Sequence, residues 1–255
     1  MDENTKNLYL AANKFLEFFY NSLKESKICE LYLKKRNLVP DIIERFKIGH
    51  CIKLHDKILN FIESEKIDYD VAKKLGIIKY DDDNKILFPF ANRLMFPIFN
   101  PYNECIGFSG RTLKIDIKPK YINSPTSLIY QKRRVLYGLN FCKEELYKNK
   151  YVFVVEGNLD VVKCHQNNLT NVVCPMGTSF TEEQCKILKR YVDAIIIIFD
   201  GDDAGRKAAK DAKIIIKNNN INCIIFKLPD GYDPDSFIDK YSIDKLNYYI
   251  NKRKM

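Results

Sequence analysis

Residues 195–209, IIIIFDGDDAGRKAA, lead from a short block of β-branched residues directly into three carboxylates. A short apolar run that is stopped by glycine and followed by a helix-forming stretch predicts a buried parallel strand passing into a helix. The acids then lie at the carboxyl end of the strand, where the loops of open α/β sheets form ligand crevices. Alternatively, Asp202 or Asp203 only caps the helix expected over 204–217. One cap needs a single acid, so both interpretations stay open.

The same alternation of strand and helix extends over the second half of the chain. The apolar blocks YVFVVEG, NVVCPMG, AIIIIFDGD and NCIIFKLPDG alternate with helix-forming stretches that begin near residues 159, 181 and 203. This order predicts a small parallel sheet with helices on its faces, which is an α/β domain.

The first half has a different pattern. Residues 5–26 carry apolar side chains at helical spacing, 31–49 predict two short helices broken near Pro40, and 56–75 add further helix. Apolar runs alternate with turn residues over 86–112, which predicts antiparallel strands and hairpins. We place the boundary between the two patterns near residues 142–150.

Composition narrows the class of protein. The 255 residues are 46% hydrophobic, enough for a substantial core, and no apolar run has the length of a signal-peptide core or a membrane span. Eight cysteines without a C-x-x-C pair argue against a zinc ribbon or a disulfide framework and favour free thiols in a reducing compartment. The net charge of +9 favours an anionic partner such as nucleic acid, although a Lys-rich composition explains it equally well. The histidines lack metal-ligand spacing, and His50 and His55 are expected at the surface.

Three of the four expected parallel strands end in acidic residues. These are Glu156 and Asp160 after the first strand, Asp200 and Asp202 after the third, and Asp230, Asp233 and Asp235 after the fourth. Because adjacent strands lie about 4.8 Å apart, the carboxylates converge on one edge of the sheet. Crowded like charges need cations, and hard oxygen ligands suit Mg²⁺ or Mn²⁺. The sequence therefore predicts a divalent-cation site.

Eight blocks, in this order, resemble the catalytic core of the bacterial-type (DnaG) DNA primases, including their Toprim domain. They are YLKKRNLVPDIIERFKIG, RLMFPIFNPYNECIGFSGR, PKYINSP, LYGL, VVEGNLD, GTSFT, FDGDDAGRKAA and LPDGYDPDSF. Two blocks depart from the family pattern. Where the family usually has Gly-Tyr-Met-Asp, residues 157–160 are Gly-Asn-Leu-Asp, which keeps the acid. Where the family usually has Lys-Gly-Arg, residues 132–134 are Lys-Arg-Arg, which adds a positive charge.

The resemblance implies a domain organisation. We expect an amino-terminal primase-core subdomain of helices and antiparallel strands with a basic nucleic-acid-binding face over 1–145, a Toprim domain over 146–241, and the start of a truncated helical tail over 242–255. The family's zinc-binding and helicase-binding domains are expected to lie outside this sequence, which would make it a fragment or a domain of a larger protein. No zinc is expected in this chain.

The resemblance also implies an activity. A DNA primase is a nucleotidyltransferase, a DNA-directed RNA polymerase of the primosome that makes short RNA primers on single-stranded DNA for replication. The expected partners are the DNA template, ribonucleoside triphosphates, the RNA–DNA primer product, and, through regions outside this sequence, a replicative helicase and a zinc-binding domain, with no membrane. The expected compartment is the cytoplasm (nucleoid) of a bacterium, or alternatively an organelle such as a plastid.

Residue roles follow from the same resemblance. The expected ligands of two or more Mg²⁺ or Mn²⁺ ions are Glu156, Asp160, Asp200, Asp202, Asp233 and Asp235; Glu156, Asp200 and Asp202 are the expected catalytic residues, with Glu156 as ligand or general acid/base. The expected contacts to nucleic acid or nucleotide are Arg93, Arg111, Lys120, Tyr121, Asn123, Lys132 and Arg134. Alternatively, the charges over 118–134 belong to a solvated loop.

Two other functions stay open. Another Toprim enzyme, a nuclease or a topoisomerase, would need a nuclease partner domain or a strand-passage domain carrying a nucleophilic tyrosine. A non-catalytic template-binding subunit would have no electrostatic reason to retain six converging acids. A primer-synthesis assay with Mg²⁺ or Mn²⁺ separates all three.

Overall fold

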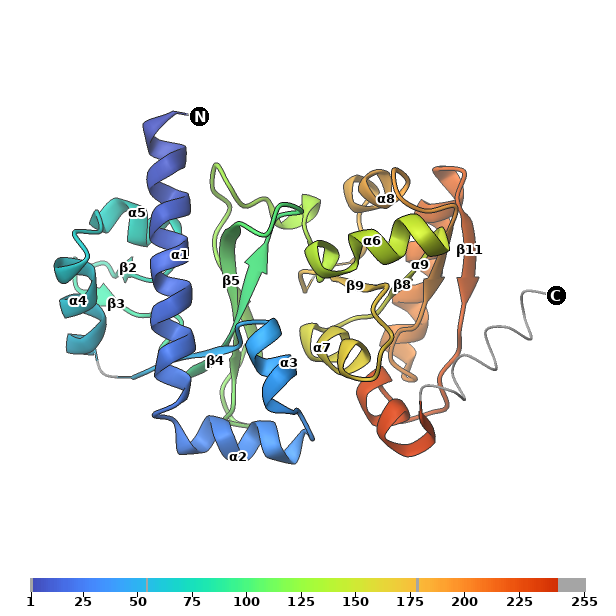
Figure 1. Ribbon diagram of the computed structural model, residues 1–255, viewed down its shortest axis with the longest axis horizontal. Helices are drawn as coiled ribbons and strands as arrows, with labels where there is room; N and C mark the ends of the chain where they lie inside the picture. Colours follow the sequence, from blue (N-terminus) through green and yellow to red (C-terminus); the bar gives the residue numbers. More distant parts are fainter. Residues whose placement is uncertain (1, 54, 178, 243–255) are drawn as a thin grey trace. The chain divides into compact units, whose positions relative to one another are not determined.

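The computed structural model describes residues 2–53, 55–177 and 179–242 (Figure 1). The chain forms two compact units, Met1–Gln131 and Lys132–Met255. This division falls earlier than the sequence boundary between 145 and 146, because residues 136–149 pack with the second unit. The helical tail expected over 242–255 lies outside the described residues, apart from residue 242.

The first unit begins with helices. They are α1 (Glu3–Leu23), α2 (Lys27–Lys35), α3 (Pro40–Arg45), α4 (His55–Ser64) and α5 (Tyr69–Lys74). The carboxylate of Asp2 accepts a hydrogen bond from the backbone N of Thr5 and thereby caps α1. Pro40 stands at the first position of α3, where its missing N–H costs no hydrogen bond. The predicted helices are confirmed, including the break before Pro40.

The sheet of the first unit is antiparallel, as predicted. Its strands are β1 (Gly49–Cys51), β4 (Arg93–Phe99), β5 (Cys105–Thr112) and β6 (Tyr121–Asn123), in the order β1-β4-β5-β6; β2 (Lys79–Tyr80) and β3 (Ile86–Leu87) form a separate pair. Helix α1 packs on this sheet, with the Phe19 ring edge-on to Phe108 at 5.2 Å. A Cβ on Gly49 would lie 2.6 Å from the carbonyl carbon of Phe19, so the close approach of α1 requires glycine there.

His50 corrects one expectation. Its side chain lies on β1, opposite Leu94 of β4, and the residue is only 5% exposed. Burial lowers the pKa of His50 and favours the neutral imidazole. The prediction of a surface position was wrong because β1, a strand that the sequence pattern did not reveal, carries this residue into the interior.

The second unit contains a five-stranded sheet in the order β11-β10-β8-β9-β7. The strands are β7 (Leu136–Tyr137), β8 (Tyr151–Val154), β9 (Val172–Pro175), β10 (Ala194–Ile197) and β11 (Asn222–Ile225). Strands β8 to β11 are parallel, which confirms the prediction. Strand β7 pairs antiparallel with β9 and was not predicted.

Helices cover this sheet. They are α6 (Leu139–Asn149), α7 (Asn158–Gln166), α8 (Glu182–Leu188) and α9 (Asp203–Asn218), with a 3₁₀ turn η1 (Lys132–Arg134) and a helical segment at 234–242. Ile195 and Ile197 share a hydrophobic cluster with residues of α6, α8 and α9. Ile196, which points to the opposite face, is also fully buried. Burial on both faces explains the unbroken apolar run of this strand.

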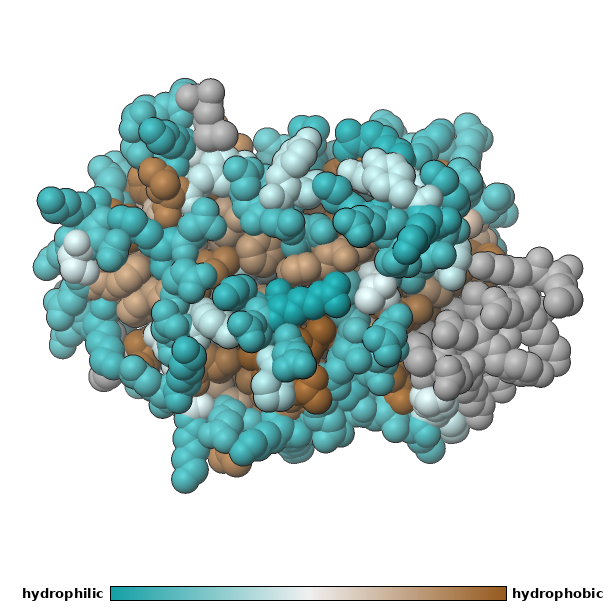
Figure 2. Space-filling model, viewed as in Figure 1, coloured by the Kyte–Doolittle hydropathy of each residue, from teal (hydrophilic) through white to brown (hydrophobic). Residues whose placement is uncertain are grey.

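Hydrophilic residues cover most of the surface drawn in Figure 2, and hydrophobic side chains are visible between them, in places next to one another. In the part of the chain that the structure describes, no helix is both long and apolar enough to cross a bilayer. The eight cysteines are free thiols, and seven of them are buried. Burial raises the pKa of Cys142, for example, to about 12, so these thiols are poor nucleophiles.

Candidate functional site: an acidic edge of the second sheet

The carboxyl ends of β8, β10 and β11 lie side by side. Ile197 of β10 pairs with Val154 of β8 on one side and with Ile225 of β11 on the other. Glu156 and Asp200 follow β8 and β10 directly, and Oε1 of Glu156 accepts a hydrogen bond from the backbone N of Asp200 at 2.8 Å. The acidic loops after these two strands are therefore in direct contact. We call the set Glu156, Asp160, Asp200, Asp202, Asp233 and Asp235 the acidic rim.

Backbone N–H groups hold three further acids of the rim by one oxygen each. Oδ2 of Asp160 accepts from the N of Gly157 (3.0 Å), Oδ1 of Asp202 from the N of Gly205 (2.7 Å), and Oδ1 of Asp233 from the N of Ser236 (2.8 Å). Asp202 is thus the N-cap of α9, as the structural alternative predicted. A carboxylate has two oxygens, so a cap that orients one leaves the other available to a ligand. Capping and ligand binding are therefore compatible in one residue.

Two glycines allow the acidic loops to meet. The N of Gly201 donates to the carbonyl of Tyr232 at 2.8 Å, and a Cβ on Gly201 would lie 2.1 Å from the carbonyl oxygen of Pro229. A Cβ on Gly205 would lie 2.4 Å from the carbonyl oxygen of Asp200 and 2.8 Å from Oε1 of Glu156. Larger residues would push the loops apart.

Asp230 differs from the other acids that were noted after the fourth strand. Its carboxylate pairs with Arg206 at 2.8 Å, and its side chain is 90% exposed. The same guanidinium donates to the carbonyl of Gly201 and pairs with Asp203. Asp230 and Asp203 therefore take part in a surface network that ties α9 to the loop after β11.

The rim is crowded with negative charge. Burial raises the pKa of Asp160 well above its ordinary value, and the charges of Asp233, Asp200 and Asp235 raise it further, against the lowering effect of the Gly157 N–H. Burial also raises the pKa of Glu156, and the charge of Asp202 adds to this. Both shifts mean that the ionised rim is costly without a cation.

The donors of the rim suit a divalent ion. All are carboxylate oxygens, the ligands that Mg²⁺ and Mn²⁺ prefer. Among the residues that the structure describes, no three or more His, Cys, Asp or Glu side chains lie so that they could hold a metal ion by themselves. Mg²⁺ typically binds through one or two carboxylates together with waters and substrate phosphates. The rim fits that open mode of binding rather than a protein cage.

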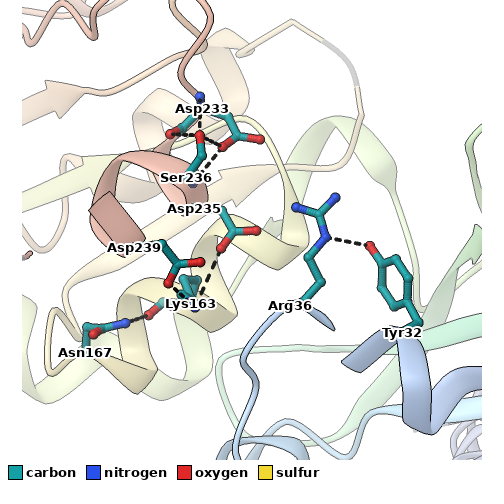
Figure 3. Close-up of polar contacts among 8 residues, drawn as sticks. All are labelled: Tyr32, Arg36, Lys163, Asn167, Asp233, Asp235, Ser236 and Asp239. Atoms are coloured by element: carbon teal, nitrogen blue, oxygen red, sulfur yellow. Dashed lines mark hydrogen bonds and ion pairs between the residues drawn. The ribbon is translucent and has the colours of Figure 1, made fainter. Parts of the chain in front are cut away.

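A lysine that sequence reasoning missed lies behind the rim. Lys163 of α7 is buried, with its Nζ 2.6 Å from Oδ1 of Asp239 and 3.9 Å from Oδ1 of Asp235 (Figure 3). The sequence does contain a signal, because Lys163 follows Asp160 by three residues in an otherwise apolar stretch, and residues so spaced share a helix face.

Two of the expected nucleic-acid contacts in the first unit are buried arginines. Nη1 of Arg93 donates to the carbonyls of Gly110, Pro119 and Lys120 at 3.2–3.3 Å, which supports the loop before β6. The guanidinium of Arg111 lies 5.0 Å from the ring of Tyr32 and 5.4 Å from that of Tyr121, and Nη1 donates to Oη of Tyr121 at 3.1 Å. Lys120 is exposed and Asn123 is half-buried on β6.

Tyr32 and Arg36 complete this aromatic and cationic group. Nε of Arg36 donates to Oη of Tyr32 at 3.1 Å (Figure 3). Sequence reasoning missed both residues, although Arg36, the C-cap residue of α2, visibly follows Tyr32 by four positions. We call Tyr32, Arg36, Arg111 and Tyr121 the tyrosine–arginine cluster.

Side chains of helix α8 and its N-cap hold the backbone of the basic segment 132–134 and the residue after it through hydrogen bonds. Oγ1 of Thr181 donates to the carbonyl of Arg133 at 2.6 Å, and Nε2 of the fully buried Gln184 donates to the carbonyl of Val135 at 2.7 Å. Thr181 and Gln184 are also the capping box of α8. The side chain of Arg134 is exposed and that of Lys132 half-buried, so both can reach a solvent-borne anion.

Two family models match most of the chain. Residues 18–143 match the model of the DNA primase catalytic core, N-terminal domain, and residues 153–238 match a Toprim-like model. The DNA primase of Listeria monocytogenes is 32% identical over 95% of this chain, and that of Haemophilus influenzae 35% identical over 97%. The chain spans 39% and 42% of the length of these two relatives.

Solved structures agree. A DNA primase domain from Pseudomonas aeruginosa has a TM-score of 0.89 at 33% identity and covers 96% of this chain and 78% of that one. A DnaG primase catalytic domain bound to single-stranded DNA has a TM-score of 0.88 at 30% identity, and the match covers 98% of this chain and 82% of that one.

Proposed function

Because this chain belongs to the family of bacterial-type (DnaG) DNA primase catalytic cores, we propose that it joins ribonucleotides into short RNA primers on a single-stranded DNA template. The observation that carries the proposal is the acidic rim, in which the loops after β8 and β10 meet through the bond between Glu156 and Asp200. The rim lies within the segment that matches the Toprim-like model.

We assign the binding of Mg²⁺ or Mn²⁺ to Glu156, Asp160, Asp200, Asp202, Asp233 and Asp235. Divalent ions, when bound there, would neutralise the phosphates of a nucleoside triphosphate and of the primer end. The protein's own part is positioning. The hydrogen bonds that Asp160, Asp202 and Asp233 accept from backbone N–H groups fix the directions of these carboxylates. We propose the half-buried Glu156 as a ligand or as the general acid/base that exchanges a proton with the attacking hydroxyl.

Template and nucleotide phosphates are assigned to the basic residues. Lys120, Lys132 and Arg134 present charges at the surface and would contact phosphates without reading sequence. Tyr121 and Arg111 would contact the template as parts of the tyrosine–arginine cluster, where aromatic faces can stack on bases. For Arg93 and Asn123 we propose support of the loop and strand that carry these groups. The proposed partners are therefore the single-stranded template, the triphosphates and the primer product.

The relatives named above are bacterial, and we propose a bacterial cytoplasmic setting in DNA replication, with helicase and zinc-binding domain as partners. The plastid alternative stays a prediction that the relatives do not test.

A primer-synthesis assay tests the proposal. Asp202→Asn is the informative variant, because asparagine also caps helices and only the charge is removed. Asp203→Asn, at the exposed neighbouring acid, is the matched control. We expect Asp202→Asn to lose RNA synthesis and Mn²⁺ affinity with the fold intact, and Asp203→Asn to retain both. Equal synthesis by both variants would contradict the site, template cleavage would favour the nuclease alternative, and binding without synthesis the non-catalytic one.

A further inference from the structure

Lys163 is a buried lysine on α7, and its side chain is only 2% exposed. Lysine is almost never buried so completely unless its ammonium is paired. Here the ammonium bridges two carboxylates of the helical segment 234–242, Asp239 at 2.6 Å and Asp235 at 3.9 Å (Figure 3). The charge is therefore balanced from that segment.

The two partners differ in their need for the ammonium. The Asp239 side chain is 41% exposed and can be solvated by water, whereas that of Asp235 is 6% exposed. A carboxylate as buried as Asp235 requires a protein cation or a metal ion nearby. Asp235, rather than Asp239, is thus the carboxylate whose charge needs Lys163 as its balancing cation.

Asp235 has a protein cation beside one of its oxygens. Asp160, Asp202 and Asp233 each have one oxygen held by a backbone N–H. For Asp235, the ammonium of Lys163 lies 3.9 Å from Oδ1, an ion-pair distance at which its charge can favour one orientation of the carboxylate. Asp160 and Lys163 are three residues apart on α7, so one helix supplies both a rim acid and this cation.

We propose that Lys163 is a positioning residue: it balances the charge of Asp235 and directs that carboxylate into the rim, so that divalent-ion binding depends on a protein cation behind the site. The inference rests on the proposed function, since it takes the rim to bind metal. Groups that orient metal ligands typically contribute 10–100-fold in metal affinity. Simple repulsion predicts the opposite sign, because removing a nearby ammonium should tighten the binding of a second cation.

The opposite signs make the test decisive. Mn²⁺ binding to the full chain is measured from the electron paramagnetic resonance signal of the free ion, for wild type, Lys163→Met, Asp235→Asn and the double variant. We expect Lys163→Met to bind Mn²⁺ about ten-fold more weakly. The double variant should bind no more weakly than Asp235→Asn alone, because Lys163 acts through Asp235.

Asn167→Ala is the matched control. Nδ2 of Asn167 donates to the carbonyl of Lys163 at 2.9 Å, so the variant perturbs the same helix without changing a charge (Figure 3). It should bind Mn²⁺ like wild type. Unchanged or tighter binding by Lys163→Met would overturn the proposal, as would a loss that persists in the Asp235→Asn background.

Folding defects are also informative. If Lys163→Met does not fold, circular dichroism of the double variant decides, because that variant lacks both charges. A folded double variant supports the proposal, since the defect then comes from the unbalanced Asp235. An unfolded double variant contradicts it. If wild type itself binds no Mn²⁺, the proposed metal rim fails first and the inference with it, which distinguishes the two failures.

Discussion

Gly205→Ala sets helix propensity against tertiary packing. Gly205 lies in the first turn of α9, where alanine should stabilise an isolated helix by about 1 kcal/mol. The alanine Cβ, however, would lie 2.4 Å from the carbonyl oxygen of Asp200 and 2.9 Å from its N. Both are backbone atoms and cannot rotate away, so the loop after β10 must move.

The cost of that movement can be estimated. Overpacking of this kind typically costs about 1–3 kcal/mol. Displacement of Asp200 also weakens its bond to the carboxylate of Glu156, and a hydrogen bond to a charged group contributes about 1.5–3 kcal/mol. Set against the propensity gain of about 1 kcal/mol, we expect a net destabilisation of about 1.5–5 kcal/mol if the hydrogen bond is lost, and less if it is only weakened.

Urea unfolding followed by circular dichroism measures this change, with Mn²⁺ titration as a second readout. Ala204→Gly, at the exposed neighbouring position, calibrates the propensity difference in the same helix. We expect Gly205→Ala to unfold at lower urea and to bind Mn²⁺ more weakly. A variant more stable than wild type, with unchanged Mn²⁺ binding, would refute the packing argument.

Three further predictions concern charged residues and the hydrogen bond that holds the backbone of the basic segment. Because the pKa of Asp160 is raised in the folded protein, the folded state binds more protons than the unfolded state. Without divalent ions, the free energy of unfolding should therefore fall as the pH rises above 3.8, the ordinary pKa of aspartate. Thermal melts with and without Mg²⁺ check this, and Asp160→Asn should weaken the dependence of stability on pH. Arg111→Lys keeps the charge but loses planar stacking on tyrosine, so single-stranded DNA should bind more weakly, with an unchanged slope of log affinity against log salt concentration. Lys120→Ala should lower the magnitude of that slope by about 0.7. Gln184→Met leaves the carbonyl of Val135 without its donor, which should lower the free energy of unfolding in urea by about 1–3 kcal/mol. DNA binding should weaken while Mn²⁺ binding is retained. Intact DNA binding would show that this hydrogen bond is not needed to hold the basic segment.

Local sequence determined the order of elements in the second unit and the edge that carries the acids. Strand and helix periods are local properties, and acids that follow parallel strands must lie at the same end of the sheet. Ile195 to Ile198 and Asp200 were therefore readable as a buried strand with an acid at its end. Even the capping role of Asp202 could be stated, because a cap depends on residues three apart.

Tertiary structure decided the environment of individual side chains. His50 is buried because β1 pairs with a strand more than forty residues away, and Arg93 turns inward to the carbonyls of Pro119 and Lys120. The partners of Lys163 lie more than seventy residues along the chain. Neither a period nor a motif encodes such pairings, since they arise only when distant segments pack together. Burial and the loss of solvent then change what a charged side chain can do.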